Sequence, residues 1–488
     1  MNEQELSTAL SSINLWWSGL PVPSRIKKSD NRRKIFWEIA NKRLEDKNIC
    51  SITGPRQVGK TTLMGQLIEF QVREKKIDPK RIIYIPLDND LLLINSDNAL
   101  IDCLKIYFDY VLGEVPAKLK SKVYVYLDEI QSLPDWAKTL KSYWDTYENV
   151  KFIVSGSSHT KLYSDASESL VGRINFMLVL PFKFREFLEY NVASEARSKE
   201  LEFSHVTLRD SLKQSLKDGN PQNFYKAITQ LHIKVAVELP IIKKQLDSYL
   251  IKGGYPGLLE FGENYDKALE RIRTDLELTV YKDIHKIFNT RNSEDLMALL
   301  LLVANSSGQK INYTKLSQTI GIDKRTVTDY LSYTNLLFLT QESPFYKTNK
   351  FKQAEKNGKI YLLDVGHRNA LLGKMNKEML KEDEAGLVMQ TVVFGHASRL
   401  RFYLSNYTEH EIFYWEDNTG EVDIVLDLPI IVLPIEVKRK SGEKGMAALQ
   451  RFIEENKKSK WGIIITQDTL KIEKNILFLP LWAFLLTC

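Results

Sequence analysis

The hydrophobic positions of this chain follow two different periods, and their alternation predicts an α/β core in its first part. Short, continuously apolar runs are typical of buried strands, whereas apolar positions that recur every three or four residues indicate amphipathic helices. The apolar runs lie at residues 49–52, 81–87, 123–127, 151–155 and 174–180, with helical stretches between them. We therefore expect strands that alternate with helices over residues 1–187.

Beyond residue 187 the helical period dominates, and strands return only near the C-terminus. Residues 190–300 are helical by pattern, and their polar part, 194–223, predicts a surface insertion. A compact helix, turn, helix and strand follow within 308–347. A further helix is expected at 385–404, and the order after it is three strands, a helix and a strand, at 411–415, 421–426, 430–437, 445–455 and 461–466.

The residues after the first apolar run match a phosphate-binding motif at every fixed position. The pattern Gly-x-x-x-x-Gly-Lys-Thr begins at Gly54 and is preceded by a strand and followed by a helix, as a P-loop requires. Gly54 and Gly59 let the backbone approach a phosphate chain, and Lys60 supplies a positive charge to the β- and γ-phosphates. Thr61 offers a hydroxyl group to Mg²⁺, and Thr62 completes the predicted ATP-binding set.

A second strand ends in two carboxylates, which is what the other half of such a site needs. Asp128 and Glu129 follow the apolar run 123–127. We expect Asp128 to bind Mg²⁺ and Glu129 to polarise the attacking water. A strand and a helix lie between the two motifs, and a Glu follows the Asp. Both features indicate the ATPase class in which an inserted strand separates the P-loop strand from the acidic strand.

Two further side chains follow the next strands of this core. Ser157 comes after the apolar run 151–155, where a hydroxyl group could sense the γ-phosphate or hold the water, or belong to a Ser-rich turn. Arg173 precedes the run 174–180 and could act as an arginine finger, in cis or across a subunit boundary. The basic patch between Arg25 and Lys34 is interpreted as a solvated face; contact with the base or a neighbouring subunit is the alternative.

Residues 308–347 have the pattern of a winged helix. The second helix begins at Lys324, and Asp323 is placed to cap it. Arg325, Thr326 and Thr328 then lie, with Lys324, at the start of the predicted recognition helix, where base and phosphate contacts belong. Double-stranded DNA is one partner that this pattern predicts, and packing against protein is the alternative.

The C-terminal order αβββαβ is typical of restriction-endonuclease-like domains. Glu436 and Lys438 are two residues apart, so both point from the same strand face, and Asp423 lies on the strand before them. Asp423 and Glu436 could hold one Mg²⁺, and Lys438 could activate a water against a phosphodiester. One departure stands on the preceding helix, where related nucleases place a Glu and this chain has Gln390, a poorer ligand for a hard cation.

Composition sets the remaining expectations. The formal net charge of +6 over 488 residues permits nucleic-acid contact without requiring it. The three cysteines lack metal-ligand or disulfide spacing, and the polar start of the chain does not match a signal peptide, so we expect a cytoplasmic protein. The apolar run 476–488 is too short to span a bilayer and predicts a final buried strand.

The order of these motifs resembles a prokaryotic AAA-like P-loop ATPase family whose C-terminal domain, of uncharacterised function, resembles restriction endonucleases. The resemblance covers most of the chain. The segments that carry it are 54–62, 127–131, 134–136, 155–158, 170–173, 181–187, 249–257, 359–364 and 436–438. It implies ATP binding and slow hydrolysis, and it says little about biological role.

Together these patterns predict four units. They are an AAA-like ATPase core at 1–187, a helical lid at 188–305, a winged helix at 306–348 and a nuclease-like α/β domain of the PD-(D/E)xK type at 355–488. We expect an ATP- and Mg²⁺-dependent ATPase that couples its nucleotide state to DNA handling or cleavage and could form a homo-oligomer. The alternative is a nucleotide-dependent signalling switch whose C-terminal domains bind protein.

Overall fold

The computed structural model describes most of the chain, and the described residues form two compact units, 1–180 and 181–488. The described residues are 3–88, 99–133, 135–157, 169–191, 195–284, 288, 290, 292–347, 357–381, 384–405, 412–418, 420–429, 431–439 and 443–488.

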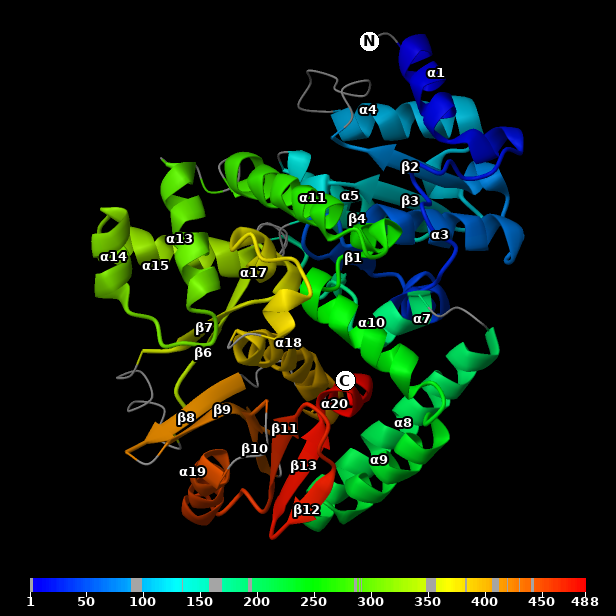
Figure 1. Cartoon of the computed structure of the whole chain (residues 1–488). Coiled ribbons are helices and arrows are strands. Elements are labelled where there is room, and N and C mark those ends of the chain that lie inside the picture. The colour runs from blue at the N-terminus through cyan, green and yellow to red at the C-terminus, as the bar shows by residue number, and fades with distance from the viewer. Residues whose placement is uncertain are drawn as a thin grey trace. The chain divides into compact units, whose positions relative to one another are not determined.

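The first unit is built on a parallel sheet of five strands with the order β2-β3-β4-β1-β5 (Figure 1). Continuously apolar strand sequences predict burial on both faces, and β1, β3 and β4 are buried along their whole length. The strands are β1 (Ile49–Thr53), β2 (Ile82–Pro86), β3 (Val123–Asp128), β4 (Val150–Gly156) and β5 (Ile174–Leu178). Its α-helices are α1 (Glu3–Ile13), α2 (Lys34–Glu38), α3 (Lys60–Arg73), α4 (Ala99–Ile106) and α5 (Trp136–Thr146).

The strand order confirms one prediction directly. Strand β4 pairs with β1 on one side and with β3 on the other, so it separates the P-loop strand from the acidic strand. All of these pairs are parallel, and the carboxyl ends of β1, β3 and β4 therefore meet at one edge of the sheet. The candidate ATP site lies at that edge, as expected for an open α/β sheet.

The outer edge of β2 is covered by side chains from the N-terminal segment. Asn14 is fully buried, and its Oδ1 accepts a hydrogen bond from the Tyr84 backbone N–H at 2.7 Å. Its Nδ2 donates to the Tyr84 carbonyl at 3.0 Å, so one amide side chain pairs with the strand as a neighbouring strand would. The indole N–H groups of Trp16 and Trp17 both donate to the Ile82 carbonyl. An edge that would otherwise be free to pair with another chain is thereby satisfied.

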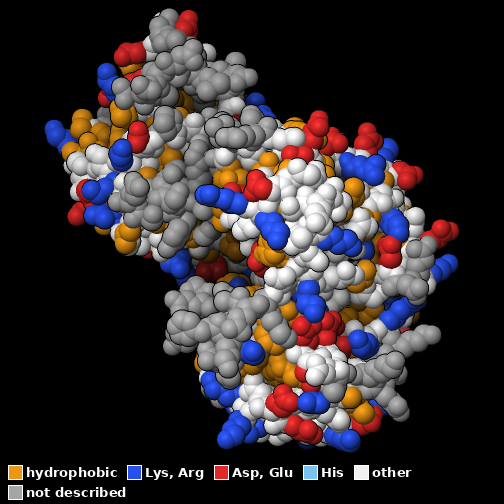
Figure 2. Space-filling view, turned by 90° about the vertical axis from the view of Figure 1, so that its left-hand side faces the viewer, with side chains coloured by type: hydrophobic (Ala, Val, Ile, Leu, Met, Phe, Trp, Pro, Cys, Tyr) orange, Lys and Arg blue, Asp and Glu red, His pale blue; other side chains and the backbone are white. Residues whose placement is uncertain are grey.

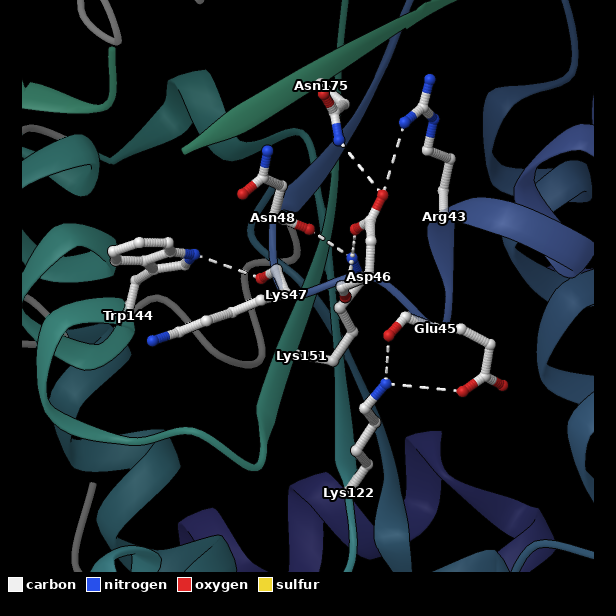
Figure 3. A network of polar contacts seen from close by, with 9 residues as sticks. All are labelled: Arg43, Glu45, Asp46, Lys47, Asn48, Lys122, Trp144, Lys151 and Asn175. Carbon is white, nitrogen blue, oxygen red and sulfur yellow. Dashed lines mark hydrogen bonds and ion pairs between the residues drawn. The ribbon is translucent and has the colours of Figure 1, made fainter. Parts of the chain in front are cut away.

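A polar network around Lys151 lies at the amino ends of β1, β4 and β5, at the edge of the sheet opposite the candidate ATP site (Figure 3). Lys151, on β4, is 2% exposed, and its Nζ donates to Asp46 Oδ1 at 2.7 Å and to the Asp46 carbonyl at 2.9 Å. Arg43 and Asn175 bind the other carboxylate oxygen of Asp46. Burial lowers the pKa of Lys151, and Asp46 opposes that shift. The network ties the segment that enters β1 to β4 and β5.

The second unit begins with helices. These are α7 (Phe184–Asn191), α8 (Glu195–Asp218), α9 (Gln222–Lys234), α10 (Leu239–Lys252) and α11 (Tyr265–Glu277), followed by a π-helical stretch η8 (Leu278–Ile284). Helices α8 and α9 pack against each other, with Leu208, Leu212 and Phe224 buried. The sequence predicts the polar stretch 194–223 as a surface insertion, and its part from residue 205 onward, the part whose side chains are described, is packed along one face.

The middle of the second unit is a three-helix bundle joined to a two-stranded antiparallel sheet. The elements are α13 (Ser293–Asn305), α14 (Tyr313–Ile320), α15 (Lys324–Leu336), β6 (Thr340–Ser343) and β7 (Lys359–Leu362), and α17 (Val365–Leu371) follows. A bridge between Lys310 and Lys359 adds a short third strand segment between α13 and α14. Asp323 caps α15 as predicted, because its carboxylate accepts from the Thr326 N–H at 2.9 Å.

The C-terminal part is a six-stranded sheet with the order β12-β13-β11-β10-β9-β8. Its elements are α18 (Ala385–Ser405), β8 (Ile412–Asp417), β9 (Gly420–Asp427), β10 (Val432–Val437), α19 (Glu443–Glu455), β11 (Gly462–Thr466), β12 (Lys471–Glu473), β13 (Ile476–Pro480) and α20 (Leu481–Thr487). The predicted order of a helix, three strands, a helix and a strand is present. The final apolar run forms β13 and then α20, whose residues are all buried. Among the described helices, none combines the length and apolar character that crossing a bilayer requires.

Candidate functional site: a P-loop and two carboxylate clusters

The loop between β1 and α3 has the backbone that a P-loop needs. A Cβ atom at Gly54 would lie 1.9 Å from the Val179 carbonyl oxygen, so no larger residue fits there. Gly59 adopts φ +93°, in the region that favours glycine, immediately before α3 begins at Lys60. The N-terminal N–H groups of α3 therefore follow a turn that places them next to the loop, where they can bind an anion.

Lys60 lies over the loop that precedes it. Its side chain is buried, and its Nζ donates to the carbonyl oxygens of Gly54 and Pro55, each at 3.0 Å. The ammonium is thereby held at the concave side of the loop. This position agrees with the predicted contact of Lys60 with the β- and γ-phosphates, which stays a prediction, as does the role of Thr62.

Three hydroxyl groups from three different elements converge on Asp128 at the end of β3. Thr61, the second residue of α3, donates to Asp128 Oδ2 at 2.7 Å. Tyr84 of β2 donates to the same oxygen at 2.7 Å. Ser155 of β4 donates to Oδ1. A hydroxyl and a carboxylate oxygen are the ligands that Mg²⁺ takes beside nucleotide phosphates, so Thr61 and Asp128 fit the predicted metal contact.

Glu129 begins the loop after β3 in a strained backbone conformation. Its φ of +55° lies in the left-handed region, which is uncommon for a residue with a side chain and often marks functional sites. Gln131 donates from Nε2 both to Glu129 Oε2 and, at 3.1 Å, to Ser157 Oγ. Burial raises the pKa of Glu129, and the nearby charge of Lys60 opposes that shift. The structure thus brings Glu129 and Ser157 together through one amide.

Arg173 lies elsewhere, which corrects one of the two roles predicted for it. Its carbonyl accepts from the Ile49 N–H at 2.8 Å, so it stands at the start of β1, whereas the P-loop follows the end of that strand. At roughly 3.3 Å per residue, the two ends are about 15 Å apart, farther than an arginine side chain extends. Arg173 instead binds Asp145 at 3.1 Å and packs on Trp144. In this structure the side chain does not reach its own P-loop, and the role across a subunit boundary stays a prediction.

Three residues of this cluster, Tyr84, Gln131 and Ser155, are not among the site residues predicted from sequence. Tyr84 lies on an apolar strand in which no chemistry was expected. Register supplies the missing signal, since Pro86 pairs with Asp128 and Tyr84 therefore faces the same side as that carboxylate. Gln131 belongs to the segment 127–131, and its bridging contact depends on the turn that Glu129 makes.

A second carboxylate cluster lies on the C-terminal sheet. Asp423 of β9 and Glu436 of β10 are adjacent, because the Asp423 N–H donates to Glu436 Oε2 at 3.0 Å. Lys438 Nζ lies 2.7 Å from Glu436 Oε1, and Gln390 of α18 donates to Asp423 Oδ1. Burial and the neighbouring Asp423 raise the pKa of Glu436 to about 8. All four residues predicted from sequence are thus brought together, and their roles in metal binding and catalysis stay predictions.

Comparison with known families supports the first of these sites. Residues 46–188 match the model of a family described as AAA domain. The first unit has a P-loop NTPase core. The remaining matches, a domain of unknown function (DUF8612) at residues 243–378 and another (DUF4143) at residues 385–484, lie outside this AAA-like unit and assign no activity.

Similar whole chains carry no assigned activity. An uncharacterized protein of Methanocaldococcus jannaschii, MJ1637, is 29% identical over 95% of this chain and 91% of its own length. A second from the same organism, MJ1544, is 23% identical over 92% of each chain. Among solved structures, the Aeropyrum pernix ORC1 protein in complex with DNA matches 73% of this chain and 96% of its own, at 11% identity and a TM-score of 0.31. That score is too low to transfer any function to this chain.

Proposed function

We propose that this chain binds ATP with Mg²⁺ at the P-loop and hydrolyses it. The observation that carries the proposal is the convergence of Thr61, Tyr84 and Ser155 on Asp128, next to a P-loop lysine and a Glu–Gln–Ser chain. Lys60 and the loop N–H groups bind the phosphates, and Thr61 and Asp128 hold the metal ion, which neutralises phosphate charge. Glu129 accepts a hydrogen bond from, and so orients, the water that attacks the γ-phosphate.

We propose further that nucleotide state is coupled to DNA through the three-helix unit. The order α13, bridge at Lys310, α14, α15, β6 and β7 supports a winged helix, in which α15 would be the recognition helix. Lys324 and Arg325 are exposed at its first turn, whereas Val327, Tyr330 and Leu331 face the core. An exposed basic start of this helix supports phosphate contact more than protein packing.

The charge distribution limits this proposal to a local contact. On the face of the molecule shown in Figure 2, Lys and Arg side chains are interspersed with Asp and Glu, and the described residues form no continuous basic area there. DNA binding through this face would thus depend on a few residues. We expect the affinity for DNA to fall as salt is added, with a slope in proportion to the number of those residues. We propose no DNA cleavage, because the carboxylate oxygens of Asp423 and Glu436 already pair with N–H donors and ammonium groups.

A second candidate function is a nucleotide-dependent switch that binds protein. It is favoured by a groove of about 370 Å³ formed by α11, η8, α13 and α17. Leu276, Met297 and Leu301 line the groove, and Leu301 is exposed. Arg273, Glu277 and Glu294 also line the groove, so its mixed apolar and charged surface fits a protein segment better than it fits a nucleic acid.

ATP turnover measured with and without duplex DNA decides between the two candidates. With Glu129→Gln as the background control, the DNA-coupled candidate predicts stimulation by DNA. The double variant Lys324→Glu/Arg325→Glu should then lose the stimulation and keep basal turnover. A charge-matched control, Lys226→Glu/Lys267→Glu, changes exposed lysines on α9 and α11 and should keep both. Turnover that is indifferent to DNA in the unaltered protein would favour the protein-partnered switch.

A further inference from the structure

Lys359 lies inside the carboxylate cluster of the C-terminal sheet, although it comes from a different part of the chain. It is the first residue of β7, in the strand pair that follows the three-helix unit, and its side chain is 1% exposed. Its Nζ lies 2.8 Å from Glu421 Oε1 and 3.6 Å from Asp423 Oδ1. A buried ammonium is stable only when carboxylates or other acceptors pair with it. Glu421 and Asp423 are the carboxylates that pair with Lys359.

The two carboxylates that were expected to hold a metal ion are already engaged on every oxygen. Asp423 Oδ1 accepts from Gln390 and faces Lys359, and its Oδ2 accepts from the Val437 N–H at 3.0 Å. Glu436 Oε1 pairs with Lys438, and its Oε2 accepts from the Asp423 N–H. Two of these partners are backbone N–H groups, which cannot turn away, and two are ammonium groups, whose charge repels a metal ion. The partners of Asp128 at the P-loop are hydroxyl groups instead, which can rotate when a metal ion binds.

The residues present therefore do not fit Mg²⁺. That ion requires nearly octahedral oxygen ligands and binds best to several carboxylates that are free of other cations. Here the carboxyl-bearing strands meet an amide donor and two ammonium groups. Among the described residues, no group of three or more His, Cys, Asp or Glu side chains is placed to hold a metal ion.

Lys438 and Lys359 differ in how easily their ammonium groups can move away from the carboxylates. The side chain of Lys438 is 42% exposed and can turn into water when a cation arrives. The side chain of Lys359 is 1% exposed and lies between Glu421 of β9 and the ring of Tyr414, whose centroid is 5.2 Å from its Nζ. Its ammonium group is therefore less free to turn into water than that of Lys438.

We propose that Lys359 takes the place of a metal ion in this nuclease-like domain. Its ammonium balances Asp423 and Glu421 and ties strand β7 to strand β9, so the cluster joins two parts of the second unit without a divalent cation. The domain then acts as a metal-free connector in this conformation. This inference is independent of the ATP site and of whether the chain binds DNA.

Titration of the full-length protein with MnCl₂ alone, without nucleotide, tests the inference. The variant Asp423→Asn should bind as much Mn²⁺ as the unaltered protein, because no ion binds at Asp423. Lys359→Met keeps the apolar stem, removes the charge and should add one Mn²⁺ site per chain, seen by calorimetry or electron paramagnetic resonance. Lys359→Arg retains the charge and should add none.

The double variant Lys359→Met/Asp423→Asn should lose the added site, which separates it from any Mn²⁺ bound at Asp128. If Lys359→Met fails to fold, the comparison of the unaltered protein with Asp423→Asn still decides the matter. Loss of an Mn²⁺ site in Asp423→Asn alone would overturn the inference, as would a folded Lys359→Met that binds no additional Mn²⁺.

Discussion

At the scale of single residues, the proposed ATP site would assign binding and chemistry to different side chains. Lys60 is a buried ammonium aimed at the P-loop, and we expect Lys60→Ala to abolish tight ATP binding because the phosphates lose their point charge. Glu129→Gln should leave binding intact and lower turnover by roughly 10²-fold or more, since an amide cannot accept a proton from water. Fluorescent-nucleotide binding and phosphate release measure the two effects. Retained turnover in either variant would refute the role given to that residue.

Gln131 shows why the site is not a sum of independent residues. Its amide joins Glu129 to Ser157, and the turn that allows this contact requires Glu129 at positive φ. A substitution that only relaxes this turn would misplace two functional groups at once. The sequence motif alone does not predict this coupling, because no spacing of residues indicates the positive φ of Glu129 or the amide bridge of Gln131.

At the scale of elements, the Gly253–Gly254 turn after α10 is held by a carboxylate more than one hundred residues away in sequence. Asp364 accepts from the Gly254 N–H at 2.9 Å and from the Gly366 N–H at 2.8 Å, and it is buried. A Cβ atom at Gly253 would lie 2.0 Å from Asp364 Oδ1. Helix α10 and helix α17 are therefore joined through one side chain.

We expect Asp364→Ala to destabilise the second unit by about 2–4 kcal/mol, because two buried N–H groups lose a charged acceptor. Urea unfolding monitored by circular dichroism measures the change. Asp266→Ala, at an exposed position on α11, is the matched control and should change the free energy of unfolding by less than about 0.5 kcal/mol. A loss in Asp364→Ala no larger than in the control would contradict the clamp.

Elements were predictable from sequence where one period was sustained, and side-chain partners were predictable only where strand order or a short separation in sequence brings them together. The apolar runs placed β1 and β3, and the strand order that separates them followed from the motif spacing. The cap of α15 by Asp323 was predictable because it is a contact between near neighbours. Lys359 could not be foreseen, since its partners on β9 depend on how β7 packs, and the site of Arg173 depends on strand direction.

At the scale of the whole molecule, acid should weaken the second unit through two buried histidines. Burial lowers the pKa of His396 and of His367 to about 3. His396 is committed to its neutral form, because Nε2 accepts from the Phe184 N–H at 3.1 Å while Nδ1 contacts the Val392 carbonyl. Unfolded histidine has a pKa of roughly 6.5, so between pH 6.5 and 3 only the unfolded chain takes up these protons.

Stability should therefore be full above pH 6.5 and fall as the pH drops, at up to roughly 1.4 kcal/mol per pH unit for each histidine. Chemical denaturation between pH 7.5 and 5 measures this slope. His396→Gln should reduce the slope even if it lowers stability at pH 7.5. An unchanged slope in that variant would show that other groups cause the acid sensitivity.

The position of Arg173 leads to a prediction about oligomerisation. If Arg173 contributes to hydrolysis, it must do so in the site of a neighbouring copy, because its own P-loop is out of reach. Turnover per chain should then rise with protein concentration. Arg173→Ala and Lys60→Ala, each inactive alone, should recover part of the activity when mixed, because the Lys60→Ala chain still supplies its arginine. Mixtures with no recovery, together with concentration-independent turnover, would remove Arg173 from the reaction.

The pairing of Asn14 with Tyr84 has a practical consequence for anyone who prepares this protein. The strand that this side chain holds also carries the Tyr84 hydroxyl group that donates to Asp128. Removal of residues 1–18 to aid crystallisation would thus alter the surroundings of a proposed magnesium ligand. It would also expose the unpaired backbone groups of an edge strand, which can pair with another chain and cause aggregation. Loss of activity or solubility in such a shortened protein would report on its N-terminal segment, and it should not be taken as evidence about the catalytic residues themselves.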